Sequence, residues 1–113
     1  PYGLVSMNKG KFWVTGKLDR QIKFDELDHK KELVFDLNSR FRKKWTVNNH
    51  PLFGGEITLK SKKKKVSLFE IQPNKKNNYP NLVSFEVHKE LGFISFSFKN
   101  ENNEIIKQNV VRN

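Results

Sequence analysis

Apolar and polar residues alternate in short runs along most of this chain. The clearest runs are residues 33–37 (Leu-Val-Phe-Asp-Leu), 83–87 (Val-Ser-Phe-Glu-Val) and 93–98 (Phe-Ile-Ser-Phe-Ser-Phe). An alternation with a period of two residues is typical of strands that bury one face. We therefore predict that these three segments are β-strands.

Shorter runs of the same kind predict further strands, separated by turns that contain Asn, Gly, Pro and charged residues. The predicted strands are 11–18, 21–24, 32–37, 44–47, 56–60, 66–71, 83–87 and 93–98, with 105–111 as a last strand or a fraying tail. About seven to nine short strands at close spacing, without a long helical pattern, predict an all-β fold. The expected architecture is an antiparallel β-sandwich.

The composition agrees with that fold class. The chain of 113 residues has no alanine, the strongest helix former, and ten phenylalanines. We expect one domain over residues 1–113, with loose ends at 1–10 and 105–113. The alternation predicts a single core, while the parity of Trp13 and Trp45 leaves those two side chains unassigned. The predicted inward residues are Phe12, Val14, Phe24, Leu33, Phe35, Leu37, either Val66 or Leu68, Val83, Phe85, Val87, Ile94, Phe96 and Phe98.

The sequence offers no constellation for catalysis. The absence of cysteine excludes thiolate zinc sites and disulfides. The three histidines fall in separate predicted turns, without the close spacing of metal ligands. Neither a Gly-x-Ser-x-Gly elbow nor a phosphate-binding glycine pattern is present. We expect a protein that is not an enzyme and that holds no metal or cofactor.

Charge is the densest feature of the chain. Half of the net charge of +10 comes from five lysines at a predicted hairpin tip: Lys60, Lys62, Lys63, Lys64 and Lys65. Such a cluster attracts polyanions. Two alternatives remain open: a solvated tip that deters pairing between sheet edges, and a codon bias that supplies lysine without a functional cause.

Aromatic residues adjoin basic ones in two places. Phe12 and Trp13 precede Lys17, and Phe41 and Trp45 flank Lys43 and Lys44. An exposed aromatic side chain on a basic surface can stack nucleic-acid bases, whereas a buried one belongs to the core. The sequence leaves both alternatives open for these residues.

Several segments in order resemble the CS domain, a small β-sandwich of co-chaperones and nuclear-distribution-type proteins. They are residues 22–25 with 32–35, 52–57, 65–71 with the basic pair 75–76, 79–82 and 93–98. The resemblance implies a non-enzymatic module that binds another protein, with a chaperone among the candidate partners. The partner-binding residues that it implies are Phe53, Tyr79, Pro80 and Leu82.

Two weaker resemblances compete. Residues 36–41, 47–49 and 53–56 echo the order of the galectin sugar-binding motif, which would assign a galactoside to Asn38, Arg40, Asn49 and Glu56. Residues 14–17 place a glycine in a first strand, as oligonucleotide-binding barrels often do. The three families imply different strand orders: a seven-stranded sandwich, sheets of six and five strands, and a closed five-stranded barrel.

The function favoured by the sequence is protein binding by a CS-like module. The alternatives are nucleic-acid binding through the basic surface and glycan binding by a galectin-like face. No apolar run is long enough to span a membrane, and residues 1–5 lack the pattern of a signal peptide. We therefore expect an intracellular protein, cytoplasmic or nuclear.

Overall fold

The structure of the protein is a computed structural model that describes residues 5–15, 31–48, 50–74 and 80–110. The predicted strand 21–24 and the residues Phe24, Asn49 and Tyr79 lie outside this part of the chain. Within it the chain forms nine strands and no helix. The all-β prediction is confirmed.

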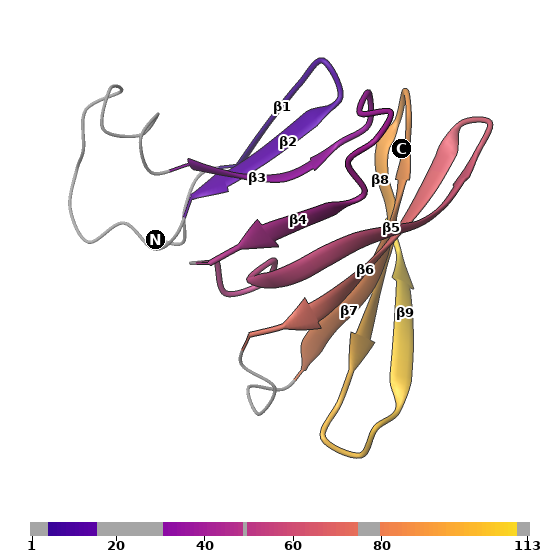
Figure 1. Cartoon of the computed structure of the whole chain (residues 1–113). Helices are drawn as coiled ribbons and strands as arrows, with labels where there is room; N and C mark the ends of the chain where they lie inside the picture. The colour runs from indigo at the N-terminus through magenta and orange to yellow at the C-terminus, as the bar shows by residue number, and fades with distance from the viewer. Residues whose placement is uncertain (1–4, 16–30, 49, 75–79, 111–113) are drawn as a thin grey trace.

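The strands form two antiparallel sheets that pack together as a sandwich, and in both sheets strands adjacent in sequence pair with each other. The small sheet has the order β1-β2-β3 and lies beside the fan of the large sheet, whose order is β4-β5-β6-β7-β8-β9 (Figure 1). The small sheet consists of β1 (Val5–Asn8), β2 (Lys11–Thr15) and β3 (Lys31–Asp36). The large sheet consists of β4 (Lys44–Val47), β5 (Gly55–Lys63), β6 (Val66–Pro73), β7 (Asn81–His88), β8 (Gly92–Lys99) and β9 (Ile105–Asn109).

Two segments near the chain ends form strands: residues 5–8, which were expected to be loose, and residues 105–109, for which a last strand was one of two alternatives. Residues 5–8 are not loose but form β1, and the turn that joins β1 to β2 has positive φ angles at Lys9 (52°) and Gly10 (82°). Two positive φ angles are typical of a type I′ turn, whose twist matches that of a hairpin. Residues 105–109 form β9, which pairs with β8.

Phenylalanine rings from both sheets form the centre of the core. Phe12 and Phe35 of the small sheet stack with their ring centroids 5.4 Å apart, and Phe35 stacks on Phe69 of the large sheet at 4.8 Å. Phe69 in turn stacks on Phe85 at 5.1 Å. This continuous contact between the sheets confirms a single Phe-rich core among the described residues.

The predicted inward faces are wrong in β6 and partly wrong in β7. In β6 Phe69 and Ile71 are buried, whereas Val66 and Leu68 are half-buried. The sequence is ambiguous here because apolar residues occupy both faces of this strand. In β7 the register shifts between Leu82 and Ser84, so Leu82 is buried and Val83 is only half-buried. A bulge moves the residues beyond it to the other face, which alternation alone does not reveal.

Strand β8 differs from the prediction for another reason. Ile94, Phe96 and Phe98 are all half-buried, and Ser95 between them is 3% exposed. The large sheet has six strands, and the small sheet, with three, cannot cover all of them equally. Phe96 still packs against the core, through Phe93 at 5.1 Å.

Leu33 and Leu37 are also half-buried, packed against the core, whereas Val34 is fully buried. The register of β2 against β3 shifts between Phe12 and Trp13, which leaves Val34 without a partner in the pairing. Of the two unassigned tryptophans, Trp45 is in the core at 1% exposure, and Trp13 is half-buried with Lys31 Nζ 4.7 Å from its ring centroid.

Candidate nucleic-acid interface

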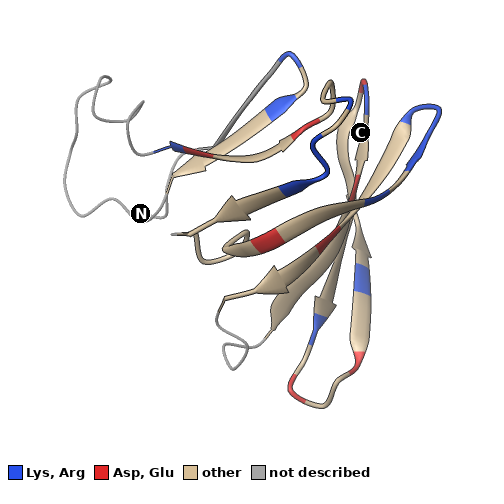
Figure 2. Cartoon of the chain, viewed as in Figure 1, with Lys and Arg blue, Asp and Glu red and all other residues tan. Residues whose placement is uncertain are grey.

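Basic residues in four connections lie at one end of the molecule (Figure 2). These connections are the β1–β2 turn, residues 37–43 between β3 and β4, the β5–β6 hairpin tip and the β7–β8 turn. In an antiparallel meander each strand reverses direction, so every second connection lies at the same end. The fold therefore brings together basic residues that are far apart in the sequence.

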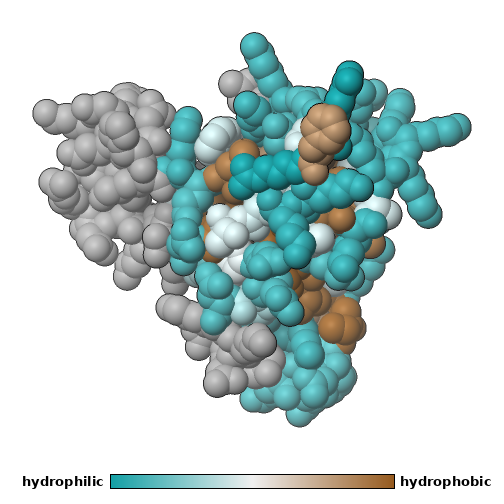
Figure 3. All heavy atoms as spheres, in the orientation of Figure 1, coloured by the Kyte–Doolittle hydropathy of each residue, from teal (hydrophilic) through white to brown (hydrophobic). Residues whose placement is uncertain are grey.

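A groove of about 900 Å³ lies between these connections, and the described residues that line it include nine basic ones and no acidic one. Small and apolar residues such as Ser61, Ser67 and Leu59 make up much of the remainder. Long hydrophilic side chains cover most of the described surface in the view of Figure 3. The basic residues of the groove are Lys9, Arg40, Lys43, Lys60, Lys62, Lys63, Lys64, Lys65 and Lys89.

Hydrogen bonds between the connections hold the groove in shape. The backbone N–H of Leu37 donates to the carbonyl of Gly10 at 2.8 Å, and the Asn38 amide donates to the carbonyl of Lys9. Lys62 Nζ reaches back to the carbonyl of Leu37 at 2.9 Å. Gly10 has a φ of +82°, which favours glycine, and a Cβ atom there would lie 2.8 Å from Asn38 Nδ2 and displace that amide.

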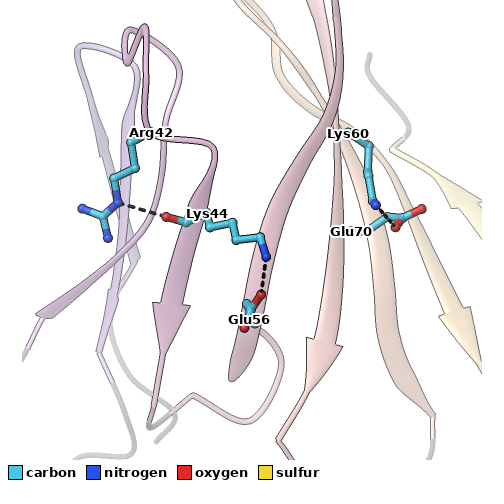
Figure 4. Close-up of polar contacts among 5 residues, drawn as sticks. All are labelled: Arg42, Lys44, Glu56, Lys60 and Glu70. Carbon is cyan, nitrogen blue, oxygen red and sulfur yellow. Dashed lines mark hydrogen bonds and ion pairs between the residues drawn. The ribbon is translucent and has the colours of Figure 1, made fainter.

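Few carboxylates neutralise the groove. Lys60 pairs with Glu70 and Lys65 with Glu90, each with an N–O distance of 3.4 Å (Figure 4 shows the first pair). Such exposed pairs are weak. Lys62 bonds a backbone carbonyl instead of a carboxylate. Among the described residues, no carboxylate pairs with the other six basic side chains of the groove: Lys9, Arg40, Lys43, Lys63, Lys64 and Lys89. An unneutralised groove of this kind attracts anions.

Phe41 lies in the β3–β4 connection at the border of the groove. Its side chain is 94% exposed, and Arg40 and Lys43 on either side of it line the groove. The neighbouring Arg42 is held in place, because its backbone N–H donates to Ser39 Oγ and its Nε donates to the carbonyl of Lys44, both at 3.0 Å (Figure 4 shows the second bond). The guanidinium of Arg42 also lies 5.8 Å from the Trp45 ring.

Two of the predicted partner-binding residues are in the core. Phe53 is 4% exposed and packs on Phe12 and Phe85, and Leu82 is 2% exposed. The expectation that they contact a partner at the surface is corrected, because burial leaves them no surface to offer. Pro80 is exposed, as a surface role requires.

The galectin-like set is divided between elements. Asn38 and Arg40 lie beside the basic groove, whereas Glu56 is on β5 and pairs with Lys44 at 3.2 Å (Figure 4). No hydrogen bond or ion pair joins these three residues to one another in the described structure. The structure therefore places two of the three described members of this set in the groove lining and the third on β5.

The two described histidines stabilise turns. Nδ1 of His50 accepts hydrogen bonds from the backbone N–H groups of Leu52 and Phe53, both at 3.1 Å, and Nδ1 of His88 accepts two bonds in the same way. Burial lowers the pKa of His50, with Glu32 acting in the opposite direction. The described residues contain no group of three or more acidic or histidine side chains that could hold a metal ion. They also contain no helix capable of crossing a membrane.

Sequence reasoning identified the five lysines of the hairpin but not the rest of the groove. Lys9, Arg40, Lys43 and Lys89 were not joined to them because they lie in three other connections, far from the hairpin in the sequence. The signal that could have found them is the alternation of the turns between the two ends of a meander. The chain matches no protein-family model, no curated protein and no solved structure, so the groove has to be interpreted from its own chemistry.

Proposed function

We propose that this protein is a non-enzymatic nucleic-acid-binding module whose ligand places its phosphate backbone in the basic groove. The observation that carries the proposal is the composition of that groove: its described lining holds nine lysine and arginine side chains and no acidic residue. These side chains come from four separate connections, so a polyanion would contact them along a surface rather than at one flexible tip.

The energetics of such a surface favour a chain of phosphates. Each lysine that neutralises a phosphate releases condensed counterions, and this release supplies much of the affinity of basic proteins for nucleic acid. Many of the groove's cations lack a carboxylate partner among the described residues, so binding does not have to break an existing ion pair. The hydrogen bonds at Leu37, Asn38 and Lys62 shape part of the site in advance, which lowers the entropy lost on binding.

The test compares two double variants of equal net charge. Lys63→Gln/Lys64→Gln removes two cations from the groove, and Lys44→Gln/Lys107→Gln removes two cations that line no part of it and pair with Glu56 and Glu86. Binding to a fluorescent oligonucleotide is measured by anisotropy from low to moderate salt. Each lost phosphate contact with a single strand reduces the slope of log K against log salt by about 0.7. We therefore expect the groove variant, which loses two contacts, to flatten this slope by about 1.4, and the other variant to leave it unchanged.

An equal loss of affinity in both variants would show that net charge, rather than the groove, controls binding. Unchanged binding by the groove variant would remove the groove from the site. Thermal melting of both variants at moderate salt provides the folding control, because exposed charges contribute little to stability once salt screens them.

A second candidate function is protein binding, as the CS resemblance implies. Strand β9 supports it, because it lies at an edge of the large sheet and leaves Ile105 (59%) and Ile106 (49%) exposed. Edge strands can pair with a strand of another protein. If β9 binds a partner protein, Ile106→Lys should abolish capture of that partner, whereas Lys63→Gln/Lys64→Gln should still capture it. Capture by both variants would contradict a role for β9.

A further inference from the structure

We infer that the ligand of the groove is single-stranded nucleic acid and that Phe41 is the platform on which one of its bases stacks. This inference rests on the proposed function. Phe41 is 94% exposed. Burial of a phenylalanine side chain is favourable, so a ring left in water is available to a partner.

The position of Phe41 connects it to the phosphate site. Arg40 precedes it and Lys43 follows two residues later, and both line the groove. Contacts on either side fix this part of the connection: Asn38 bonds the β1–β2 turn, and Arg42 bonds Ser39 and Lys44. The connection that carries Phe41 is therefore anchored beside the cations, and the ring projects from it into solvent.

An exposed aromatic ring beside a basic groove favours some polyanions over others. Proteins that bind single strands pair a positively charged groove for the backbone with aromatic side chains for the bases. A duplex keeps its bases stacked on one another, and heparin has no aromatic face, so neither gains from an exposed ring. Phe41 is the one aromatic residue among the highly exposed large hydrophobic residues of the described chain, since Trp45 of the same segment is 1% exposed.

The experiment measures the affinity of the whole chain for a fluorescent oligothymidylate, for a DNA duplex and for heparin. Stacking of one base contributes roughly 1–3 kcal/mol, so Phe41→Ala should weaken binding to the single strand about 5- to 150-fold. Phe41→Trp should retain it. Binding of the duplex and of heparin should stay within about twofold, because neither offers an unstacked base.

Leu91→Ala is the matched control. Leu91 is a second exposed apolar residue, 54% accessible, in the β7–β8 turn beside Lys89 of the groove. We expect this variant to bind the single strand like the wild type. An equal loss in Leu91→Ala would overturn the inference, because it would show a general need for apolar surface rather than base stacking.

The two proposals fail in different ways. If Phe41→Ala binds the single strand normally while Lys63→Gln/Lys64→Gln does not, the stacking role is overturned and the nucleic-acid function stands. If Phe41→Ala loses heparin and the single strand equally, the loss is not specific for bases and the inference is again overturned. If the wild type binds none of the three polyanions, the proposed function fails, and the inference fails with it.

Discussion

Phe85 lies at the meeting point of the aromatic side chains that join the two sheets. Its ring is 1% exposed and contacts Phe35, Phe53 and Phe69 at centroid distances of 5.9, 5.6 and 5.1 Å. Phe85→Ala would leave a cavity among these rings, so we expect it to lower the free energy of unfolding by about 3–5 kcal/mol. Denaturant titration measures the change.

The matched control is Phe41→Ala, since that ring is 94% exposed and should change stability by less than about 0.5 kcal/mol. Phe96→Ala should fall between the two, because Phe96 is half-buried. Equal losses for Phe85 and Phe96 would contradict the unequal cover that the small sheet gives to the large one.

His50 makes folding sensitive to pH. Burial lowers its pKa, so the folded state takes up a proton less readily than the unfolded state. The contribution of His50 to stability is therefore complete above the ordinary pKa of 6.5 and is lost as the pH falls from 6.5 toward the folded-state pKa. The proton would also occupy the Nδ1 lone pair that accepts the bonds from Leu52 and Phe53.

Thermal melting between about pH 7.5 and pH 5.5 tests this sign, since carboxylates titrate mainly below that window. We expect the melting temperature of the wild type to fall as the pH is lowered. The melting temperature of His50→Asn should fall less, because the asparagine oxygen can accept the same backbone hydrogen bonds without titrating. A parallel fall in both proteins would assign the pH dependence to other groups.

At the scale of the element, the start of β5 depends on a close approach of two strands. Gly55 has a φ of +148°, and a Cβ atom there would lie 2.2 Å from the carbonyl oxygen of Gln72 on β6. Gly55→Ala therefore requires both a strained backbone and a separation of the two strands. We expect it to reduce stability by more than about 2 kcal/mol, measured by denaturant titration.

Gly92→Ala separates these two causes. Gly92 also has a positive φ, +83°, but a Cβ atom there would meet nothing within 4 Å. Its substitution carries only the backbone strain, roughly 1–2 kcal/mol. If the two variants lose equal stability, the contact between Gly55 and β6 contributes nothing of its own.

At the scale of the whole molecule, charge is distributed unevenly. The net charge of the chain is +10, and nine of its cations line one groove. Like charges at close range oppose the compact state, and salt screens them over about 10 Å at 0.1 M. We therefore expect the melting temperature to rise when sodium chloride is increased from about 10 to 200 mM.

At low salt, Lys63→Gln/Lys64→Gln should raise the melting temperature by part of the amount that salt does, because it reduces the repulsion among the cations of the groove without added ions. Lys44→Gln/Lys107→Gln should not, since each of these lysines already faces a glutamate at 3.2 and 3.0 Å. A melting temperature that falls with salt would mean that the ion pairs stabilise the fold more than the groove destabilises it.

The fold class, most of the described strands and much of the core could be predicted from the sequence. A period of two residues is a local property, so strands such as β3, β7 and β8 could be predicted from neighbouring residues alone. The lysines of the β5–β6 tip were also visible, because they are contiguous.

The packing of distant segments determines which face of β6 is buried, the switch of face at Leu82, and the burial of Trp45 and Phe53. These depend on register shifts and on which sheet covers each strand, neither of which is local. It also decided the candidate site. Lys9, Arg40 and Lys89 join the hairpin lysines, and Phe41 stays exposed beside them, because the meander returns alternate turns to one end of the molecule.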